Sequence, residues 1–262
     1  MPGQVARAGL ATEIRNRLVP KLLEGVARTI AAEATPDFPV PVPVVPALRP
    51  IRHVRPEVLV VGASTGGPNA LAAFLRGLGG DCPVPVLLVQ HMPASFTGLL
   101  ARRLDGECQL TVREAANGQP LEPGLVLLAP GDQHLALRSL GPRLTARLHQ
   151  EPPVHSCRPA VDVLFDAAAS HFGAATLGVV LTGMGQDGLA GSRRIVEVGG
   201  GVLVQDEASS VVWGMPGQVA RAGLATEILP LGELAAAVLA RLGPSLPIGA
   251  AVSVPGRGSW KP

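Results

Sequence analysis

Three residues with the side-chain chemistry of a nucleophile, a base and an acid each follow a short apolar run. The first is Ser64, in the stretch Gly62–Gly66, which fits the pattern G-x-S-x-G and follows the apolar run 58–62. This pattern predicts a serine on a sharp turn between a strand and a helix, with its hydroxyl open to a substrate. A glycine-rich turn that only packs or binds phosphate is the alternative. The stretch lacks the lysine of a P-loop and the second glycine of G-x-G-x-x-G.

A serine nucleophile needs a base, and His91 is the candidate. Of the six histidines, only His91 directly follows an expected strand of the parallel core, the run 84–90. A structural or capping histidine is the alternative interpretation. The remaining histidines are His53, His134, His149, His155 and His171.

A third residue should orient the imidazole and stabilise its cation, and Asp187 is the candidate for this role. It lies in LTGMGQDG, just past the expected strand 177–183. Asp187 could instead cap the helix that follows it. Asp206 competes for the same role, and Asp132 with His134 forms a further acid and histidine pair. The order Ser, His, Asp differs from the α/β-hydrolase order, so that fold is not expected.

The elements that must position these residues alternate along the chain. Apolar runs at 58–62, 84–90, 177–183 and 201–206 alternate with helical patterns at 69–78, 96–104 and 189–199. The alternation predicts an α/β fold, a doubly wound and mostly parallel sheet with helices on both faces. We expect further helices over 161–173 and 228–242. Short apolar segments predict an antiparallel hairpin region; they are 110–115, 126–130, 135–138 and 143–148.

Composition limits the class of protein and its surroundings. The 262 residues are 47% hydrophobic, and the net charge of +2 gives no strong attraction to nucleic acid. No apolar run is long enough to cross a bilayer, and the start lacks the order of a signal peptide. The cysteines are odd in number and lack metal-ligand spacing; they are Cys82, Cys108 and Cys157. A cytoplasmic protein is expected.

Six stretches in order resemble one family, the protein-glutamate methylesterases of bacterial chemotaxis (the CheB catalytic domain). They cover roughly residues 56–242 and read VVGASTGGPNAL, QHMPASFTGLLARRLD, APGDQHL, RPAVDVLF, GVVLTGMGQDGLAG and VQDEASSVVWGMPGQVARAG. By this resemblance Ser64 is the nucleophile, His91 the base and Asp187 the orienting acid. The resemblance also places Thr65 and the main chain of Met184 on the oxyanion side.

The resemblance implies hydrolysis of γ-glutamyl methyl esters on chemoreceptor helices, with glutamine deamidation as a second activity. Both reactions pass through an acyl-enzyme and need no metal or organic cofactor. The expected partners are methylated cytoplasmic helices of chemoreceptors, with a chemotaxis kinase as a further candidate, and neither nucleic acid binding nor membrane insertion is expected. A catalytically silent module that binds receptors or a kinase is the alternative, and a nucleotide-binding protein is a third hypothesis.

The domain organisation departs from this family in one respect. We expect a helix and proline-rich linker over 1–50, a catalytic domain over 51–243 and a flexible tail over 244–262. The family usually carries a receiver domain in front, and 1–50 is too short for one, so control by phosphorylation is not expected. The fourteen residues MPGQVARAGLATEI occur at 1–14 and again at 215–228. The second copy lies where the family pattern has it, which makes the first the displaced one.

Overall fold

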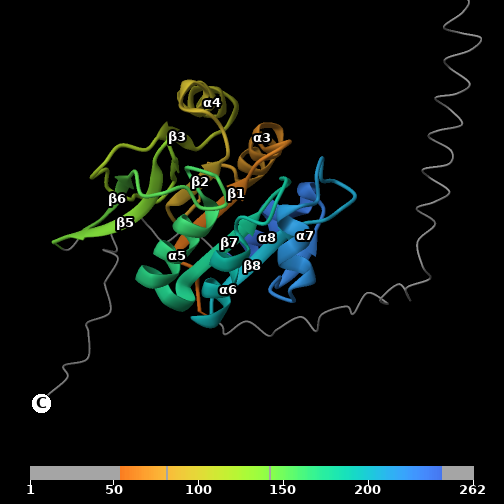
Figure 1. Ribbon diagram of the computed structural model, residues 1–262. Helices are drawn as coiled ribbons and strands as arrows, with labels where there is room; N and C mark the ends of the chain where they lie inside the picture. Colours follow the sequence, from red (N-terminus) through yellow and green to blue (C-terminus); the bar gives the residue numbers. More distant parts are fainter. Residues whose placement is uncertain (1–53, 81, 142, 244–262) are drawn as a thin grey trace, which may run out of the picture. The chain divides into compact units, whose positions relative to one another are not determined.

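The computed structural model describes residues 54–80, 82–141 and 143–243 (Figure 1). The expected linker 1–50, the tail 244–262 and the first copy of the repeat lie outside the described residues. The strands are β1 (Val58–Ala63), β2 (Val86–Gln90), β3 (Thr111–Glu114), β4 (Leu125–Leu128), β5 (His134–Leu140), β6 (Arg143–His149), β7 (Thr176–Val180), β8 (Gly201–Gln205) and β9 (Glu227–Leu229). The helices are α3 (Gly67–Leu78), α4 (Ala94–Glu107), α5 (Val161–Phe172), the short 3₁₀ turn η2 (Gly173–Ala175), α6 (Leu189–Glu197), α7 (Met215–Arg221) and α8 (Leu231–Leu242).

Seven of these strands form one sheet in the order β3-β4-β2-β1-β7-β8-β9. Every pair in this sheet is parallel. Strands β5 and β6 form a separate antiparallel hairpin. The predicted doubly wound, mostly parallel sheet with a hairpin region is therefore confirmed.

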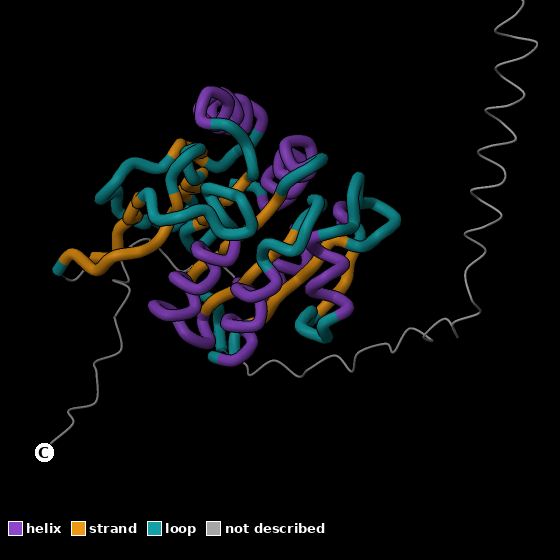
Figure 2. The backbone as a smooth tube through the Cα atoms, viewed as in Figure 1, coloured by secondary structure: helices purple, strands orange, loops and turns teal. Residues whose placement is uncertain are grey.

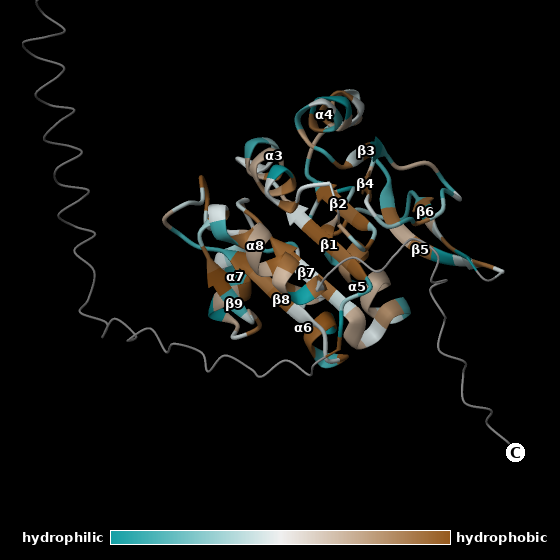
Figure 3. Cartoon of the chain, turned by 180° about the vertical axis from the view of Figure 1, so that it is seen from behind, coloured by the Kyte–Doolittle hydropathy of each residue, from teal (hydrophilic) through white to brown (hydrophobic). Residues whose placement is uncertain are grey.

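Helices cover both faces of the sheet (Figure 2). Buried residues of α3, α4 and α8 form one apolar cluster with one face of the strands. Buried residues of α5, α6, α7 and the hairpin form a second cluster on the opposite face. Strands β1, β2, β7 and β8 are buried along their whole length, which explains why they are continuous apolar runs in the sequence (Figure 3). Within the described residues, we find no helix with the length and apolar character that a bilayer crossing needs.

The predicted antiparallel region was too large. Strands β3 and β4 belong to the main sheet, where Val112 pairs with Val126 and Val126 pairs with Val86, all in parallel. The ten-residue connection 115–124 carries no helix, so the sequence shows no sign of a crossover there. Short strands joined by a glycine- and proline-containing loop resemble a hairpin when only local spacing is considered.

The C-terminal part also differs from its predicted pattern. The segment 228–242 was predicted as one helix, but Ile228 lies in β9 and α8 begins only at Leu231. Pro230 separates the two elements, because a residue before proline is disfavoured in helical conformation. The short helix α7 was not predicted at all.

The second copy of the repeat, residues 215–228, is part of the folded domain. It forms α7 and the start of β9. Met215 and Val219 are fully buried, and Leu224 is 7% exposed. The indole N–H of Trp213, just before the copy, donates to the carbonyl oxygen of Gln205. Burial of Met215, Val219 and Leu224 therefore anchors the second copy in the core, and Trp213 adds a hydrogen bond just before it.

The burial of Val219 predicts a strong effect of a charge at that position. Val219→Asp should lower the free energy of unfolding by about 3 kcal/mol, because a carboxylate would be buried without a partner. For a domain of this size, we expect a fall of about 5 to 10 °C in melting temperature, measured by calorimetry.

Val5→Asp is the matched control, since Val5 is the same position in the first copy of the repeat. If the first copy is the displaced one, this variant should melt like the wild type. Destabilisation by Val5→Asp with no effect of Val219→Asp would show that the two copies have been assigned the wrong way round.

Candidate active site

Ser64, His91 and Asp187 follow three strands that are neighbours in the sheet. Ser64 directly follows β1, His91 directly follows β2, and Asp187 lies in the loop after β7. Helix α3 leaves β1 toward one face of the sheet and α6 leaves β7 toward the other. The crevice between two such diverging connections, at the carboxyl ends of the strands, is the usual ligand site of doubly wound sheets.

The turn that carries Ser64 is closely fitted to the end of β7. The backbone N–H of Ser64 donates to the carbonyl oxygen of Thr182 over 3.0 Å, and the N–H of Gly67 donates to that of Ser64 over 2.8 Å. Gly66 has a φ of 81°, a left-handed conformation that favours glycine. A Cβ on Gly183 would lie only 2.8 Å from the Cβ of Ser64. The two glycines thus allow the loops to approach and leave Ser64 half-buried.

Thr182 links the Ser64 turn to the loop after β8. Its hydroxyl lies 3.0 Å from the carbonyl oxygen of Thr65 and accepts the backbone N–H of Val212 over 3.0 Å. Its own backbone N–H donates to Oε1 of Gln205, a fully buried side chain, over 2.8 Å. Sequence analysis missed Gln205, although its place as the last residue of a buried strand is a usable signal.

His91 and Asp187 form a buried pair. Nε2 of His91 lies 2.7 Å from Oδ2 of Asp187, and their side chains are 13% and 2% exposed. The backbone N–H of His91 donates to the carbonyl oxygen of Ala63, so the histidine is also joined to the strand that leads to Ser64. Because Nε2 faces the carboxylate, the ring presents Nδ1 as its other nitrogen.

The carboxylate of Asp187 accepts three backbone N–H groups in addition to the His91 ring. Oδ2 accepts the N–H of Val161 over 2.6 Å, and Oδ1 accepts those of Asp162 and Gly188, each over 2.9 Å. Burial by itself raises the pKa of Asp187, but the bonds from His91, Asp162 and Val161 outweigh it and lower the pKa. The alternative role, a cap on the helix that follows Asp187, is wrong, because Gly188 is the N-cap of α6 and no side-chain hydrogen bond caps that helix. Asp187 instead accepts N–H groups of the first turn of α5 while it holds His91.

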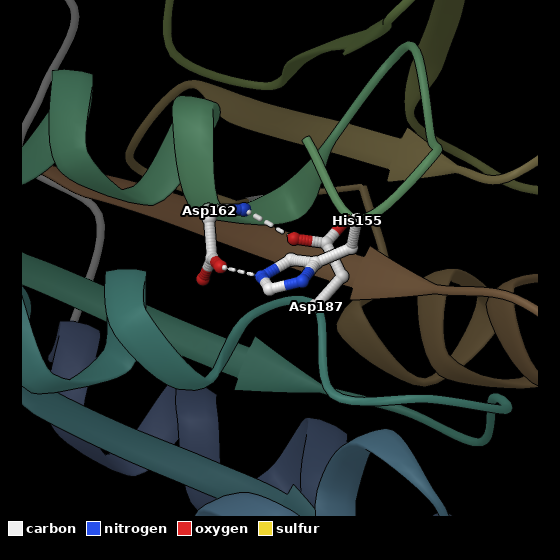
Figure 4. A group of neighbouring side chains, drawn as sticks. All are labelled: His155, Asp162 and Asp187. Carbon is white, nitrogen blue, oxygen red and sulfur yellow. Dashed lines mark hydrogen bonds and ion pairs between the residues drawn. The ribbon is translucent and has the colours of Figure 1, made fainter. Parts of the chain in front are cut away.

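A second acid and histidine pair lies beside Asp187 (Figure 4). Nε2 of His155 is 3.0 Å from Oδ2 of Asp162, which is 8% exposed. Burial raises the pKa of Asp162, and the charge of Asp187 adds to the rise. Ligand atoms of His155, Asp162 and Asp187 lie within 4.8 Å of one another, close enough to consider a metal ion. The four donors on Asp187 already use the lone pairs of its carboxylate. The three residues together are therefore poorly suited to hold a cation.

Cys157 lies against the other nitrogen of the His91 ring, which sequence analysis did not foresee. Its Sγ is 3.6 Å from Nδ1 of His91. Burial and the nearby charge of Asp187 raise the pKa of Cys157, so it stays a thiol near neutral pH. His155 and Ser156 have φ values of 49° and 61°, in a tight turn closed by hydrogen bonds between Val154 and Cys157. Such a turn normally has Asn and Gly at these positions. The left-handed backbone of His155 and Ser156 is therefore maintained by contacts with the surrounding structure.

Two backbone N–H groups near Ser64 are available to a ligand. Within the described ranges, neither the N–H of Thr65 nor that of Met184 takes part in a hydrogen bond. Met184 directly follows Gly183, which packs against Ser64, and its side chain is 73% exposed. These are the two residues that the family resemblance assigns to the oxyanion side.

The competing candidates from the sequence have other partners. Asp206 accepts the backbone N–H and the hydroxyl of Ser209, so it closes a turn after β8. Asp132 forms an ion pair with Arg158 at 2.5 Å. His134 is fully buried, where its Nδ1 accepts the backbone N–H of Ala160 and its Nε2 lies 3.2 Å from the carbonyl oxygen of Pro152. The structure brings none of these three side chains into contact with His91.

A parallel sheet with a serine, a histidine and an aspartate at adjoining strand ends defines an α/β protein with the residue types of a serine hydrolase. A family model described as CheB methylesterase matches residues 59–238. The chain belongs to this family, and the resemblance seen in the sequence motifs is confirmed.

Similar proteins agree with this assignment. A Nocardioides protein named protein-glutamate methylesterase/protein-glutamine glutaminase is 48% identical over 252 residues, covering 92% of this chain and 67% of the relative. A protein of the same name from Trichodesmium erythraeum is 51% identical over 187 residues, covering 71% and 53%. The crystal structure of the Thermotoga maritima CheB methylesterase catalytic domain has a TM-score of 0.69 and 39% identity, covering 71% of this chain and 98% of that one. The chain thus spans 53% and 67% of the two curated relatives.

The environment of Asp187 predicts how stability depends on pH. Asp187→Asn should lower the free energy of unfolding by about 3 kcal/mol at pH 7, because one oxygen that accepts N–H groups becomes a donor. The pKa of Asp187 is lowered by folding, so its contribution is present above an unfolded pKa of about 3.9 and is lost as pH falls through the folded value. In urea unfolding from pH 7 to pH 3, the difference in free energy of unfolding between the wild type and Asp187→Asn should become smaller as pH falls.

Asp162→Asn is the control with the opposite sign. Folding raises the pKa of Asp162, so its ionisation costs stability near neutral pH and this cost disappears as the carboxyl protonates in acid. The free energy of unfolding of Asp162→Asn should therefore decrease relative to that of the wild type as pH falls. A gap for Asp187→Asn that widens in acid would contradict the assigned direction of its pKa.

Proposed function

We propose that this chain hydrolyses glutamate γ-methyl esters on the cytoplasmic helices of chemoreceptors and also deamidates glutamine side chains there. The proposal is supported by the family and by the names of the relatives, which carry both activities. The observation that carries it is the His91–Asp187 pair, 2.7 Å apart, at the strand ends beside the Ser64 turn.

The geometry supports a different role for each ring nitrogen of His91. Nε2 is held by Asp187, so Nδ1 is the base that takes the proton of the Ser64 hydroxyl. As the proton moves to Nδ1, Oγ of Ser64 forms a bond to the ester carbon. The tetrahedral intermediate then collapses, and methoxide leaves as methanol with the proton from Nδ1. Water, deprotonated in turn by His91, attacks the acyl carbon. The bond to Oγ of Ser64 then breaks, Nδ1 returns the proton to Oγ, and the glutamate carboxylate is released.

The free N–H groups of Thr65 and Met184 would stabilise the negative charge on the carbonyl oxygen of this intermediate. One comes from the residue after the nucleophile and one from a neighbouring loop, which is a common composition of an oxyanion hole. Preorganised donors of this kind stabilise the transition state more than the ground state.

In the resting site, the hydroxyl of Ser64 forms no hydrogen bond with any described residue, and the Cys157 thiol is the neighbour of Nδ1. Catalytic hydrogen bonds are often loose before substrate binds, so this arrangement is compatible with the mechanism. The alternative of a catalytically silent module has less support, because all three chemically active side chains are retained.

The test is the methyl ester hydrolysis of a methylated receptor fragment, measured as release of methanol. Ser64→Ala should lower kcat by about 10⁴-fold, because no acyl-enzyme can form. Ser139→Ala, an exposed serine on the hairpin, is the matched control and should keep full activity. Near-normal turnover by folded Ser64→Ala protein would rule out Ser64 as the nucleophile.

A further inference from the structure

The side chain of Gln90 connects the two residues that the proposed reaction brings together. Gln90 is the last residue of β2 and is 2% exposed. Its Nε2 donates to the carbonyl oxygen of Ser64 over 2.9 Å and to that of His91 over 3.0 Å. One amide group thus holds the main chain of the nucleophile and the main chain of the base.

The surroundings of Gln90 are shaped to admit this amide. A Cβ on Gly67 would collide with Oε1 of Gln90, so a side chain there would displace the amide. The carbonyl oxygen of Ser64 also accepts the backbone N–H of Gly67, so it has two donors, one from Gln90 and one from Gly67. Among the described residues, the hydrogen-bond donor to the carbonyl oxygen of His91 is the side chain of Gln90.

The other end of the amide argues against a role in packing alone. Oε1 of Gln90 is buried and has no hydrogen-bond partner within the described part of the chain. An unpaired buried oxygen costs stability, and an apolar side chain of the same shape would remove this cost. Packing alone therefore does not account for a glutamine at this position, whereas the two bonds from Nε2 do.

We infer that Gln90 is a positioning residue that fixes the distance between Ser64 and His91. It touches neither substrate nor reacting atoms, and it acts through the backbone of both residues. Small displacements of reacting groups can cost about 10²-fold in rate. The inference rests on the proposed function, since it concerns the proton transfer from Ser64 to His91.

The experiment separates misplacement of the two groups from loss of folded protein. Gln90→Met keeps the approximate shape of the side chain and removes both N–H donors. For a second variant, Gln90→Glu, the control is Gln109→Glu, which replaces an exposed glutamine by its acid. The burst of p-nitrophenol from p-nitrophenyl acetate gives the acylation rate constant and, from its amplitude, the fraction of active sites. For Gln90→Met we expect an acylation rate constant about 10²-fold lower, with full amplitude and a melting temperature near that of the wild type.

Gln90→Glu adds a pH signature that a structural role would not produce. Its ionised carboxylate donates no hydrogen bond, whereas its protonated form has one O–H for the two carbonyl oxygens. The acylation rate of Gln90→Glu relative to the wild type should therefore rise as pH falls, and the ratio for Gln90→Met should stay flat.

The results that would overturn the inference are distinct. A lower burst amplitude with an unchanged rate constant would show that Gln90 only supports folding. An unchanged rate and amplitude would show that it has no role in positioning. Absence of acylation by the wild type, together with absence of methanol release from the methylated receptor fragment, would instead refute the proposed function, and the inference would fall with it.

Discussion

The buried carboxylate of Asp187 is the interaction on which the rest of the site depends. A charge with 2% exposure is tolerable only if donors surround it, and here the first turn of α5, the start of α6 and the His91 ring supply them. The N-terminal end of α5 also favours a negative charge through its aligned peptide dipoles. The orientation of the His91 ring therefore depends on groups at the ends of two helices on one face of the sheet, whereas its main chain is held by its own strand.

The second constraint is the close approach of the loops after β1 and β7. These strands pair in parallel, with Gly62 opposite Val180, so the residues that follow them meet at the same edge. Two glycines then permit contact, Gly66 through its left-handed backbone and Gly183 through its missing side chain. Because Thr182, in the loop after β7, is hydrogen-bonded to Ser64 and Thr65, the Ser64 turn and the chain leading to Met184 are held as one unit.

The sequence was sufficient to find Ser64, His91 and Asp187 because each follows an apolar run, and runs buried on both faces are readable without a structure. It was insufficient for Gln90 and Cys157. Gln90 lies 26 residues from Ser64 and Cys157 lies 66 from His91, so no local period links them. The same limit explains β3 and β4, whose parallel pairing depends on the neighbouring β2 and not on the pattern of their own residues.

The copy of the repeated segment at 215–228 depends on its neighbours for its conformation. Helix α7 has seven residues, too few to be stable alone, so tertiary contacts must hold it. The N–H groups of Gly214 and Met215 both donate to the carbonyl oxygen of Gly183, the residue that packs against Ser64. The copy at 215–228 therefore supports the loop that carries Met184 and leads to Asp187. Since the same fourteen letters also open the chain, it is the preceding Trp213 and Gly214, and the loop they contact, that give this copy its place beside the site.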